Sequence, residues 1–397
     1  MLSIIEVILA STLGFFLLYL LLLSILALFV PVRKLFRSQL NRKFACVIPA
    51  HNEERNIAKT VSSLRSVEYP KGLFHVIVIA DNCTDDTASV AWHAGAMVLE
   101  RSDMVKRGKG QALQWAFDQL LKSPVQYEGF VVIDADSVVS KNFLQVMNWY
   151  LEQGYGSIQS ADLVAPNPGA WSSEVSRISL TLYNYVRPLG RKLLKCSAGL
   201  RGNGMCFSAE TLKNVPWQAH SLTEDLEYGL ILLERGISTI FAPETRVLAT
   251  MPAKSKNAES QRTRWEGGRL PIVKKYTPVL LASAVKEWSW KKADALIDLL
   301  TPAFVNMVAV VLIVLSTKYV GENIFGVQTD ISMQVWSVLF FISVLYVLIG
   351  LVAAKADFAM CKAILYFPIY LLWKIRLYSK LLLSGITKEW IRTAREH

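Results

Sequence analysis

Two aspartates separated by one residue, Asp134 and Asp136, directly follow an apolar run at positions 131–133. An unbroken run of Val and Ile is typical of a strand that is buried on both faces of a parallel sheet. Such strands end at the carboxyl edge of their sheet, where open α/β folds bind ligands. Two carboxylates at that edge could hold a hard divalent cation together with the phosphates that it carries. A simpler interpretation is that Asp136 or Ser137 only caps the helix expected to start near Asn142.

The elements around this strand alternate between strand and helix patterns. Strand patterns occupy residues 44–50, 74–80 and 97–100, and helical patterns end near residue 65 and cover residues 111–121. This alternation predicts βαβ units, and therefore an α/β fold with a mostly parallel sheet. The turn after the first strand lacks the G-x-G-x-x-G spacing of a dinucleotide site, and the chain has no P-loop spacing either.

Two further polar side chains could belong to a nucleotide site. Asp81 follows the second strand pattern. It could accept hydrogen bonds from a base or ribose, or could only organise the turn that follows. Lys109 lies in a basic, glycine-rich stretch, residues 106–110, and could offer its charge to a phosphate or belong to a solvated turn. Three glycines at positions 199–204 predict a loop whose backbone approaches a ligand closely.

An acidic segment at residues 223–227 offers a candidate general base. Thr223 could cap a helix that carries Glu224 and Glu227 in its first turn, where acidic side chains are favourable. Asp225 is the sharper candidate for chemistry, because an ionised carboxylate that faces a cleft can accept a proton.

Gln261, Arg264 and Trp265 share one face of an expected helix. An arginine can grip a departing diphosphate with two hydrogen bonds, and a tryptophan offers an apolar face to a sugar ring. The same residues also suit an amphipathic helix that lies on a membrane. The two interpretations are compatible.

Composition and charge favour a membrane protein over a nucleic-acid-binding protein. The chain has 397 residues, is 52% hydrophobic and carries a net charge of +11. Much of the basic charge flanks apolar segments, which indicates anionic lipid headgroups as the partner and no nucleic acid. The five cysteines are scattered and lack C-x-x-C spacing. They indicate a reducing compartment, with neither a disulfide framework nor a zinc site.

The chain begins with a long uncharged stretch, residues 7–32, which predicts a transmembrane helix within residues 1–32. A cleaved signal peptide would need a basic start and a shorter apolar run, whereas this start carries Glu6. Basic residues follow directly, so the positive-inside rule predicts that the next domain is cytoplasmic.

The C-terminal part repeats this membrane character. Residues 271–298 mix Lys, Trp and apolar residues, which predicts interfacial helices. Two uncharged stretches, 299–317 and 331–354, are long enough to span a bilayer. The last apolar run, residues 363–373, is short and interrupted, so we expect it to be interfacial or re-entrant. Residues 299–397 are therefore expected to hold transmembrane and interfacial helices.

The order of these motifs resembles the membrane-embedded family 2 glycosyltransferases of the GT-A fold, which include cellulose, hyaluronan, chitin and poly-N-acetylglucosamine synthases. The matching motifs are Asn52-Glu53-Glu54, Asp81, Lys109-Gly110, Asp134-x-Asp136, Thr223-Glu224-Asp225 and Gln261-x-x-Arg264-Trp265. The resemblance implies a GT-A catalytic domain over residues 43–270. One departure is Asp81-Asn82-Cys83, where the family usually has an acidic residue followed by Gly and Ser.

The resemblance also implies a role for each matching residue. Glu53 and Asp81 would bind the nucleoside, and Lys109 the donor phosphates. Asp134 would contact the nucleotide and the metal, and Asp136 would ligate Mg²⁺ or Mn²⁺. Asp225 would be the general base. Gln261 and Arg264 would hold the donor diphosphate, and Trp265, with Glu224, would contact the acceptor.

The implied function is inverting, metal-dependent transfer of a sugar from a UDP-linked glucose or N-acetylglucosamine donor. The acceptor would lie at the cytoplasmic face of a bacterial inner (plasma) membrane. Synthesis of a cell-surface polysaccharide is the first expectation. The alternative is a single transfer to a membrane lipid, as in ceramide glucosyltransferases. Few helices are expected to span the membrane, so a polymerase would need self-association or an export partner. A remote alternative is an inactive nucleotide-sugar-binding scaffold.

Overall fold

The computed structural model describes residues 2–32, 38–167, 171–250, 255–324, 326 and 333–371, with the backbone alone at 2–3, 171 and 255–266. The chain divides into two compact units. The first, here called the sheet unit, includes Pro31–Asn167 and Lys195–Leu296. The second, the helical unit, includes Met1–Val30, Pro168–Leu194 and Ile297–Gly385, as far as these are described.

The sheet unit is built on one mixed sheet. Its strands are β1 (Phe44–Ala50), β2 (Phe74–Asp81), β3 (Met97–Arg101), β4 (Gly129–Val132), β5 (Ser137–Val139), β6 (Ser157–Val164), β7 (Met205–Ser208) and β8 (Ile240–Ala249). Among the described residues the strand order is β3-β2-β1-β4-β7-β6-β8-β5. β1 is parallel to β2 and β4, β2 to β3, and β6 to β8. β7 is antiparallel to β4 and β6, and β5 to β8. The predicted α/β fold with a mostly parallel sheet is confirmed.

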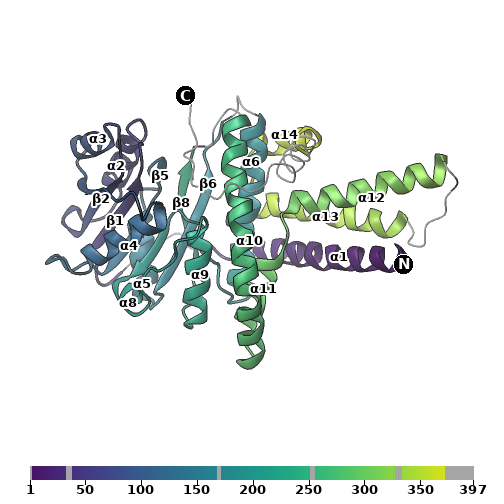
Figure 1. Ribbon diagram of the computed structural model, residues 1–397, viewed down its shortest axis with the longest axis horizontal. Coiled ribbons are helices and arrows are strands. Elements are labelled where there is room, and N and C mark those ends of the chain that lie inside the picture. Colours follow the sequence, from purple (N-terminus) through teal and green to yellow (C-terminus); the bar gives the residue numbers. More distant parts are fainter. Residues whose placement is uncertain are drawn as a thin grey trace. The chain divides into compact units, whose positions relative to one another are not determined.

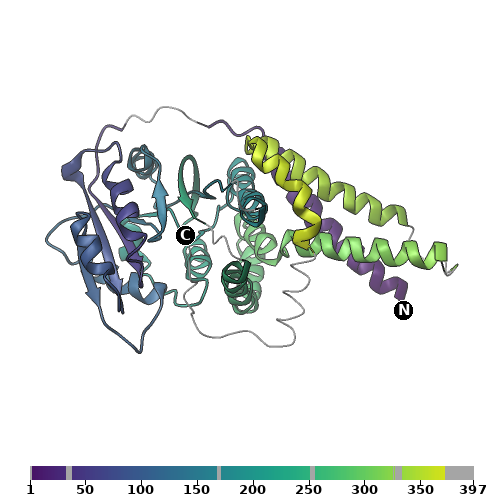
Figure 2. The same cartoon turned by 90° about the horizontal axis from the view of Figure 1, so that it is seen from above.

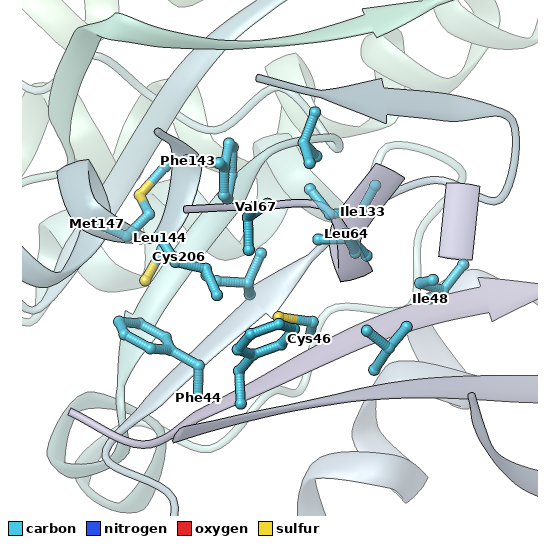
Figure 3. Close-up of a cluster of buried hydrophobic side chains, with 14 of the residues drawn as sticks. Phe44, Cys46, Ile48, Leu64, Val67, Ile133, Phe143, Leu144, Met147 and Cys206 are labelled. Carbon is cyan, nitrogen blue, oxygen red and sulfur yellow. The ribbon is translucent and has the colours of Figure 1, made fainter. Parts of the chain in front are cut away.

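Strand β1 shows why the central strands are continuous apolar runs. Phe44, Cys46 and Ile48 belong to a buried cluster on one face of the sheet (Figure 3). The alternate residues Ala45 and Val47 belong to a second buried cluster, because successive side chains of a strand point to opposite faces. Both faces are therefore dry, and apolar side chains are favoured at every position.

Helices cover both clusters (Figure 1). The first is covered by α2 (Ile57–Arg65), α3 (Thr87–His93) and α5 (Phe143–Glu152), and the second by α4 (Lys109–Leu120), α8 (Ala209–Asn214) and α9 (Glu224–Glu234). A short 3-10 turn, η1 (Lys71–Leu73), precedes β2. Parallel strands β1, β2 and β4 thus bring the loops that follow them to one edge of the sheet, as the sequence predicted.

The helix that follows Asp136 and Ser137 begins too far along the chain for either residue to be its N-cap. The N-cap of α5 is Asn142, and residues 137–139 form strand β5 instead. The interpretation of Asp136 or Ser137 as a helix cap is therefore wrong. Strand β5, which begins at Ser137, lies between Asp136 and the helix.

Helix α10 (Ser255–Lys286) and the first part of helix α11 (Trp290–Leu300), up to Leu296, complete the sheet unit. Helix α10 contains Pro271 and Pro278, and α11 follows it. Helices α10 and α9 lie next to each other, and the Lys275 Nζ atom is 2.8 Å from Glu227 Oε1. The expected end of the catalytic domain at residue 270 falls inside α10, so this boundary is not marked by a break in the helix.

The helical unit contains three helices that are long and apolar enough to cross a membrane, among the residues described. They are α1 (Leu2–Ala27), α12 (Phe304–Ile324) and α13 (Met333–Ala353). Figures 1 and 2 show the three lying side by side, and α13 contacts both α1 and α12. The shorter apolar stretch Phe358–Leu371 contains α14 (Phe358–Ala363) and η3 (Ile364–Tyr366). The presence of these helices supports the prediction that the chain is a membrane protein.

The second of these helices begins at Phe304 rather than near residue 299 as predicted. Pro302 lies between α11 and α12, and proline interrupts a helix because it lacks an N–H and clashes with the preceding turn. As a result Lys318 lies inside α12, where its Nζ atom is 2.7 Å from Glu6 Oε1 of α1. Trp336 of α13 donates a hydrogen bond to the same oxygen over 2.8 Å. A polar contact therefore joins all three helices.

An insertion between β6 and β7 belongs to the helical unit, although the expected boundaries, 43–270, assigned it to the catalytic domain. It comprises α6 (Trp171–Thr181), η2 (Leu182–Val186) and α7 (Arg187–Leu193). The Nη1 atoms of Arg187 and Arg191 lie 3.4 and 2.9 Å from the carboxylate of Asp298. These long-range contacts place the insertion in this unit, and no local sequence pattern reveals them.

Gly190 is the close point of approach between α7 and α1. A Cβ atom added there would lie 2.2 Å from the Leu23 carbonyl oxygen. Backbone atoms cannot move aside cheaply, so Gly190→Ala should lower the free energy of unfolding by about 1–3 kcal/mol. Thermal unfolding in detergent checks this. The control is Gly321→Ala in α12, where an added Cβ meets nothing within 4 Å, and where no loss is expected. Equal melting temperatures for both variants would contradict this packing.

Candidate functional site

Lys109 lies at the centre of a group of polar side chains at the edge of the sheet where the loops after β1, β2 and β4 meet. It is the first residue of α4, and its Nζ atom donates to Asp134 Oδ1 and to the Gly202 carbonyl oxygen, each over 2.6 Å. Glu224 Oε1 lies 3.6 Å from the same nitrogen. Burial alone would lower the pKa of Lys109, but the charges of Asp134 and Glu224 raise it. The lysine is therefore a firmly charged group, and the solvated-turn interpretation does not hold.

Glu224 and Asp225 open helix α9 beside this lysine. Burial raises the pKa of Glu224 to about 7, with Lys109 opposing the shift and Asp225 adding to it. Burial also raises the pKa of Asp225, and Lys109 again opposes the shift. The N-cap residue Thr223 makes no side-chain cap; its hydroxyl donates to the Gly268 carbonyl oxygen over 3.2 Å. Glu224 thus does more than favour the helix start: it is buried next to a cation.

The glycine-rich loop at 199–204 brings its backbone against these groups, as predicted. Gly202 has φ +82°, and a Cβ there would lie 3.2 Å from Asp225 Oδ2 and 3.6 Å from Lys109 Nζ. A side chain at this position would be strained and would lie close to both Asp225 and Lys109. The loop is held by Gln159, which donates to the Asn203 carbonyl oxygen over 2.7 Å and accepts the Arg201 N–H over 2.9 Å.

Glu53 and Asp81, the residues predicted to bind a nucleoside, lie after β1 and at the end of β2. Arg101 Nη1 donates to Asp81 Oδ1 over 2.5 Å, and Asn82 Nδ2 donates to the same oxygen over 3.1 Å. Burial raises the pKa of Asp81, while Arg101 lowers it. Asp81 therefore organises the turn that follows β2, which was one of the two roles considered for it from the sequence. The Glu53 carboxylate accepts a hydrogen bond from Asn56 Nδ2 over 2.9 Å.

Three residues of this region were missed by the sequence analysis. Arg101 was missed because the predicted strand stopped at Glu100, whereas β3 continues to Arg101. Asp162 and Asn203 belong to no motif. A charged residue in the middle of a strand pattern was the only signal for Asp162.

The positions of the three side chains of the Gln-x-x-Arg-Trp motif relative to the site are not described. Gln261, Arg264 and Trp265 lie on the helical backbone of α10, but their side chains are outside the described residues. Their assigned contacts with diphosphate and acceptor remain predictions.

The acids after β4 suit a hard divalent cation. Asp136 Oδ1 accepts a hydrogen bond from Ser137 Oγ over 3.0 Å, and the Asp134 side chain is 39% exposed. In the part of the chain that the structure describes, no group of three His, Cys, Asp or Glu residues could hold a metal. Mg²⁺ in proteins commonly takes one or two carboxylates and completes its shell with water and substrate phosphates. Asp134 and Asp136 fit that kind of site.

Comparison with known proteins identifies the family. A family model described as glycosyltransferase like family 2 matches residues 41–268. The chain belongs to this family. The members of this family are enzymes. The resemblance that the sequence motifs predicted is therefore confirmed.

Individual relatives transfer sugars to different acceptors. The chain is 30% identical over 234 residues to a β-monoglucosyldiacylglycerol synthase of Nostoc sp., covering 56% of this chain and 48% of that protein. It is 24% identical over 249 residues to a poly-β-1,6-N-acetyl-D-glucosamine synthase of Staphylococcus epidermidis, covering 59% and 56%. The chain spans about half the length of the curated relatives it matches.

A solved structure confirms the predicted GT-A fold. A mannosyltransferase from Pyrobaculum calidifontis, in complex with GDP-Man and Mn²⁺, has a TM-score of 0.58. The likeness covers 90% of this chain and all of that one, at 14% sequence identity. At this identity the likeness concerns the fold.

Replacing Glu224 by Gln should flatten the pH dependence of thermal stability. An unfolded Glu titrates near pH ~4.3, whereas the folded pKa of Glu224 is about 7, so the folded chain binds more protons between these values. Stability from this group is full at low pH and lost as the pH rises through the folded pKa. The melting temperature of E224Q relative to the parent should therefore rise from about pH 5 to about pH 8. A pH-independent difference would contradict the assignment.

Proposed function

We propose that this chain transfers a sugar from a nucleotide-sugar donor to an acceptor with inversion at the anomeric carbon. The carrying observation is the position of Lys109, in contact with Asp134 on one side and close to Glu224 on the other. Lys109 would face the donor diphosphate and stabilise its growing negative charge. Asp225 would take the proton of the attacking hydroxyl. One base suffices for a single in-line displacement.

A divalent cation completes the proposal. Asp134 and Asp136 would hold Mg²⁺ or Mn²⁺, and the cation, when bound, would neutralise negative charge on the departing diphosphate. Among the described residues, five acidic side chains of the site region lie near two basic ones, Lys109 and Arg201, which suits a cationic partner. These acids are Asp134, Asp136, Asp162, Glu224 and Asp225.

UDP-glucose and UDP-N-acetylglucosamine are the donors that we propose. A glucosyl and an N-acetylglucosaminyl product appear in the names of the relatives. The solved neighbour holds GDP-Man instead, so GDP-mannose is the competing donor to test.

Two acceptors remain, each with an observation in its favour. Transfer to a diacylglycerol-type membrane lipid is favoured by the 30% identical relative. Synthesis of a cell-surface polysaccharide is favoured by the poly-N-acetylglucosamine synthase, and would require self-association or an export partner because the described residues offer three candidate spans. Either reaction would take place at the cytoplasmic face of a bacterial plasma membrane, on the charge pattern after the first helix.

Product size tests the proposal. Full-length protein in lipid vesicles receives Mg²⁺ or Mn²⁺ and one radiolabelled donor at a time, with diacylglycerol present. Label in an organic-soluble species indicates a lipid acceptor, and label in a high-molecular-weight, glycosidase-sensitive product indicates a polymer. No transfer from any of the three donors, with or without metal, would reject the proposed function.

A further inference from the structure

A continuous hydrogen-bond chain runs from Asp136 into the sheet. Ser137 Oγ donates to Asp136 Oδ1 over 3.0 Å, and Asn203 Nδ2 donates to Ser137 Oγ over 2.9 Å. Asn203 Nδ2 also lies 3.3 Å from Asp162 Oδ1, to which it donates. Ser137 is 0% and Asn203 2% exposed. The chain links the first residue of β5, the loop before β7, and β6.

The orientation of the Asn203 amide is determined by its neighbours. Its Oδ1 atom accepts the backbone N–H of Asp134 over 3.0 Å, so its NH₂ group must face Ser137 and Asp162. Burial raises the pKa of Asp162, and the charge of Asp134 raises it further. A protonated carboxyl still keeps a carbonyl oxygen that can accept from Asn203. The contact therefore survives in either protonation state.

Asp162 is connected to Asp136 through hydrogen bonds. It belongs to none of the motifs on which the family resemblance rests, and within the described chain it forms no three-ligand metal group with the other acids. Its route to Asp136 passes through two donors that are both buried. Loss of the Asp162 oxygen would remove one of the three hydrogen bonds that hold the Asn203 side chain. Its donation to Ser137 would then be less tightly fixed, and so would the direction of the Ser137 hydroxyl toward Asp136.

We propose that Asp162 is a positioning residue that, through Asn203 and Ser137, orients the Asp136 carboxylate for the divalent cation. This inference rests on the proposed metal-dependent function. Hydrogen-bond partners of metal-ligating side chains typically change metal affinity or activity by about 10–100-fold when they are removed.

Metal binding without turnover tests the inference. The full chain in detergent is titrated with Mn²⁺ in the presence of UDP, or of GDP if UDP gives no binding, and free Mn²⁺ is followed by electron paramagnetic resonance. Asp162→Ala should raise the Mn²⁺ dissociation constant about 10-fold or more. Asp162→Asn keeps an oxygen that can accept from Asn203, so it should stay within about threefold of the parent.

A double-mutant cycle tests the route. Ser137→Ala breaks the chain next to Asp136, so adding Asp162→Ala to it should weaken Mn²⁺ binding by less than about twofold more. The control is Tyr150→Phe, which loses a hydrogen bond of 2.9 Å to Glu244 Oε2 elsewhere in the sheet unit. Tyr150→Phe should lower the melting temperature without changing Mn²⁺ affinity.

The outcomes separate the inference from the function beneath it. A parent protein that binds no Mn²⁺ with either nucleotide overturns both. A parent that binds Mn²⁺, with Asp162→Ala binding it equally well, overturns the inference alone. Full additivity of Asp162→Ala and Ser137→Ala also overturns it, because the two residues would then act independently.

Discussion

Asp225→Asn is expected to lower the rate constant of sugar transfer by about 10²–10⁴-fold, the usual contribution of a general base. The amide has nearly the same shape but cannot accept the proton. Because asparagine and aspartate have nearly equal volumes, the substitution should leave the packing beside Gly202 intact. The measurement is single-turnover transfer from the donor identified by product analysis, together with donor binding by titration calorimetry.

The matched control for Asp225 is Glu227→Gln, two residues further along α9. Glu227 accepts from Lys275 Nζ over 2.8 Å and from the Ser221 N–H over 3.2 Å, so it has structural partners. Its substitution should keep near-parental transfer at some cost in stability. If the parent shows no transfer and Asp225→Asn preserves the protein's effect in cells, the scaffold alternative is correct. If Asp225→Asn transfers sugar at the parental rate, Asp225 is not the base.

Much of the fold was predictable because its signals are local. Strand β1 was predicted with its observed bounds, 44–50, since a strand buried on both faces leaves a run of apolar residues. The same logic placed Asp81 and Asp134 at the ends of two parallel strands, β2 and β4, which lie on either side of β1. Lys109, Asp134 and Glu224 then meet because β4 ends beside the start of α4 and α9.

The remaining features depend on contacts between distant residues. Arg101 pairs with Asp81 across 20 positions, and Asn203 reaches Asp134 across 69. An asparagine in a glycine-rich loop has no periodicity that could predict its partner. For the same reason, the insertion between β6 and β7 could not be predicted to group with the helical unit. Its glycine and arginines contact Leu23 and Asp298, far away in the sequence.

Lys109→Met is expected to lower kcat/KM for the donor by about 10²–10³-fold, the usual loss when one group that stabilises transition-state charge is removed. A second effect has a definite sign. Lys109 lowers the pKa of both Glu224 and Asp225. Without it both values rise, and the base is protonated over more of the neutral range. The residual activity should therefore recover as the pH increases.

The pH profile separates the two roles of Lys109. A pure phosphate contact predicts a loss of equal size at every pH, whereas a lysine that also sets the charge of Asp225 predicts an acidic limb displaced to higher pH. Lys106→Met is the control, because Lys106 belongs to the same glycine-rich stretch but is exposed. Parental kinetics are expected for Lys106→Met. An unchanged profile for Lys109→Met would mean that the acids of α9 titrate independently of this lysine, contrary to its 3.6 Å approach to Glu224.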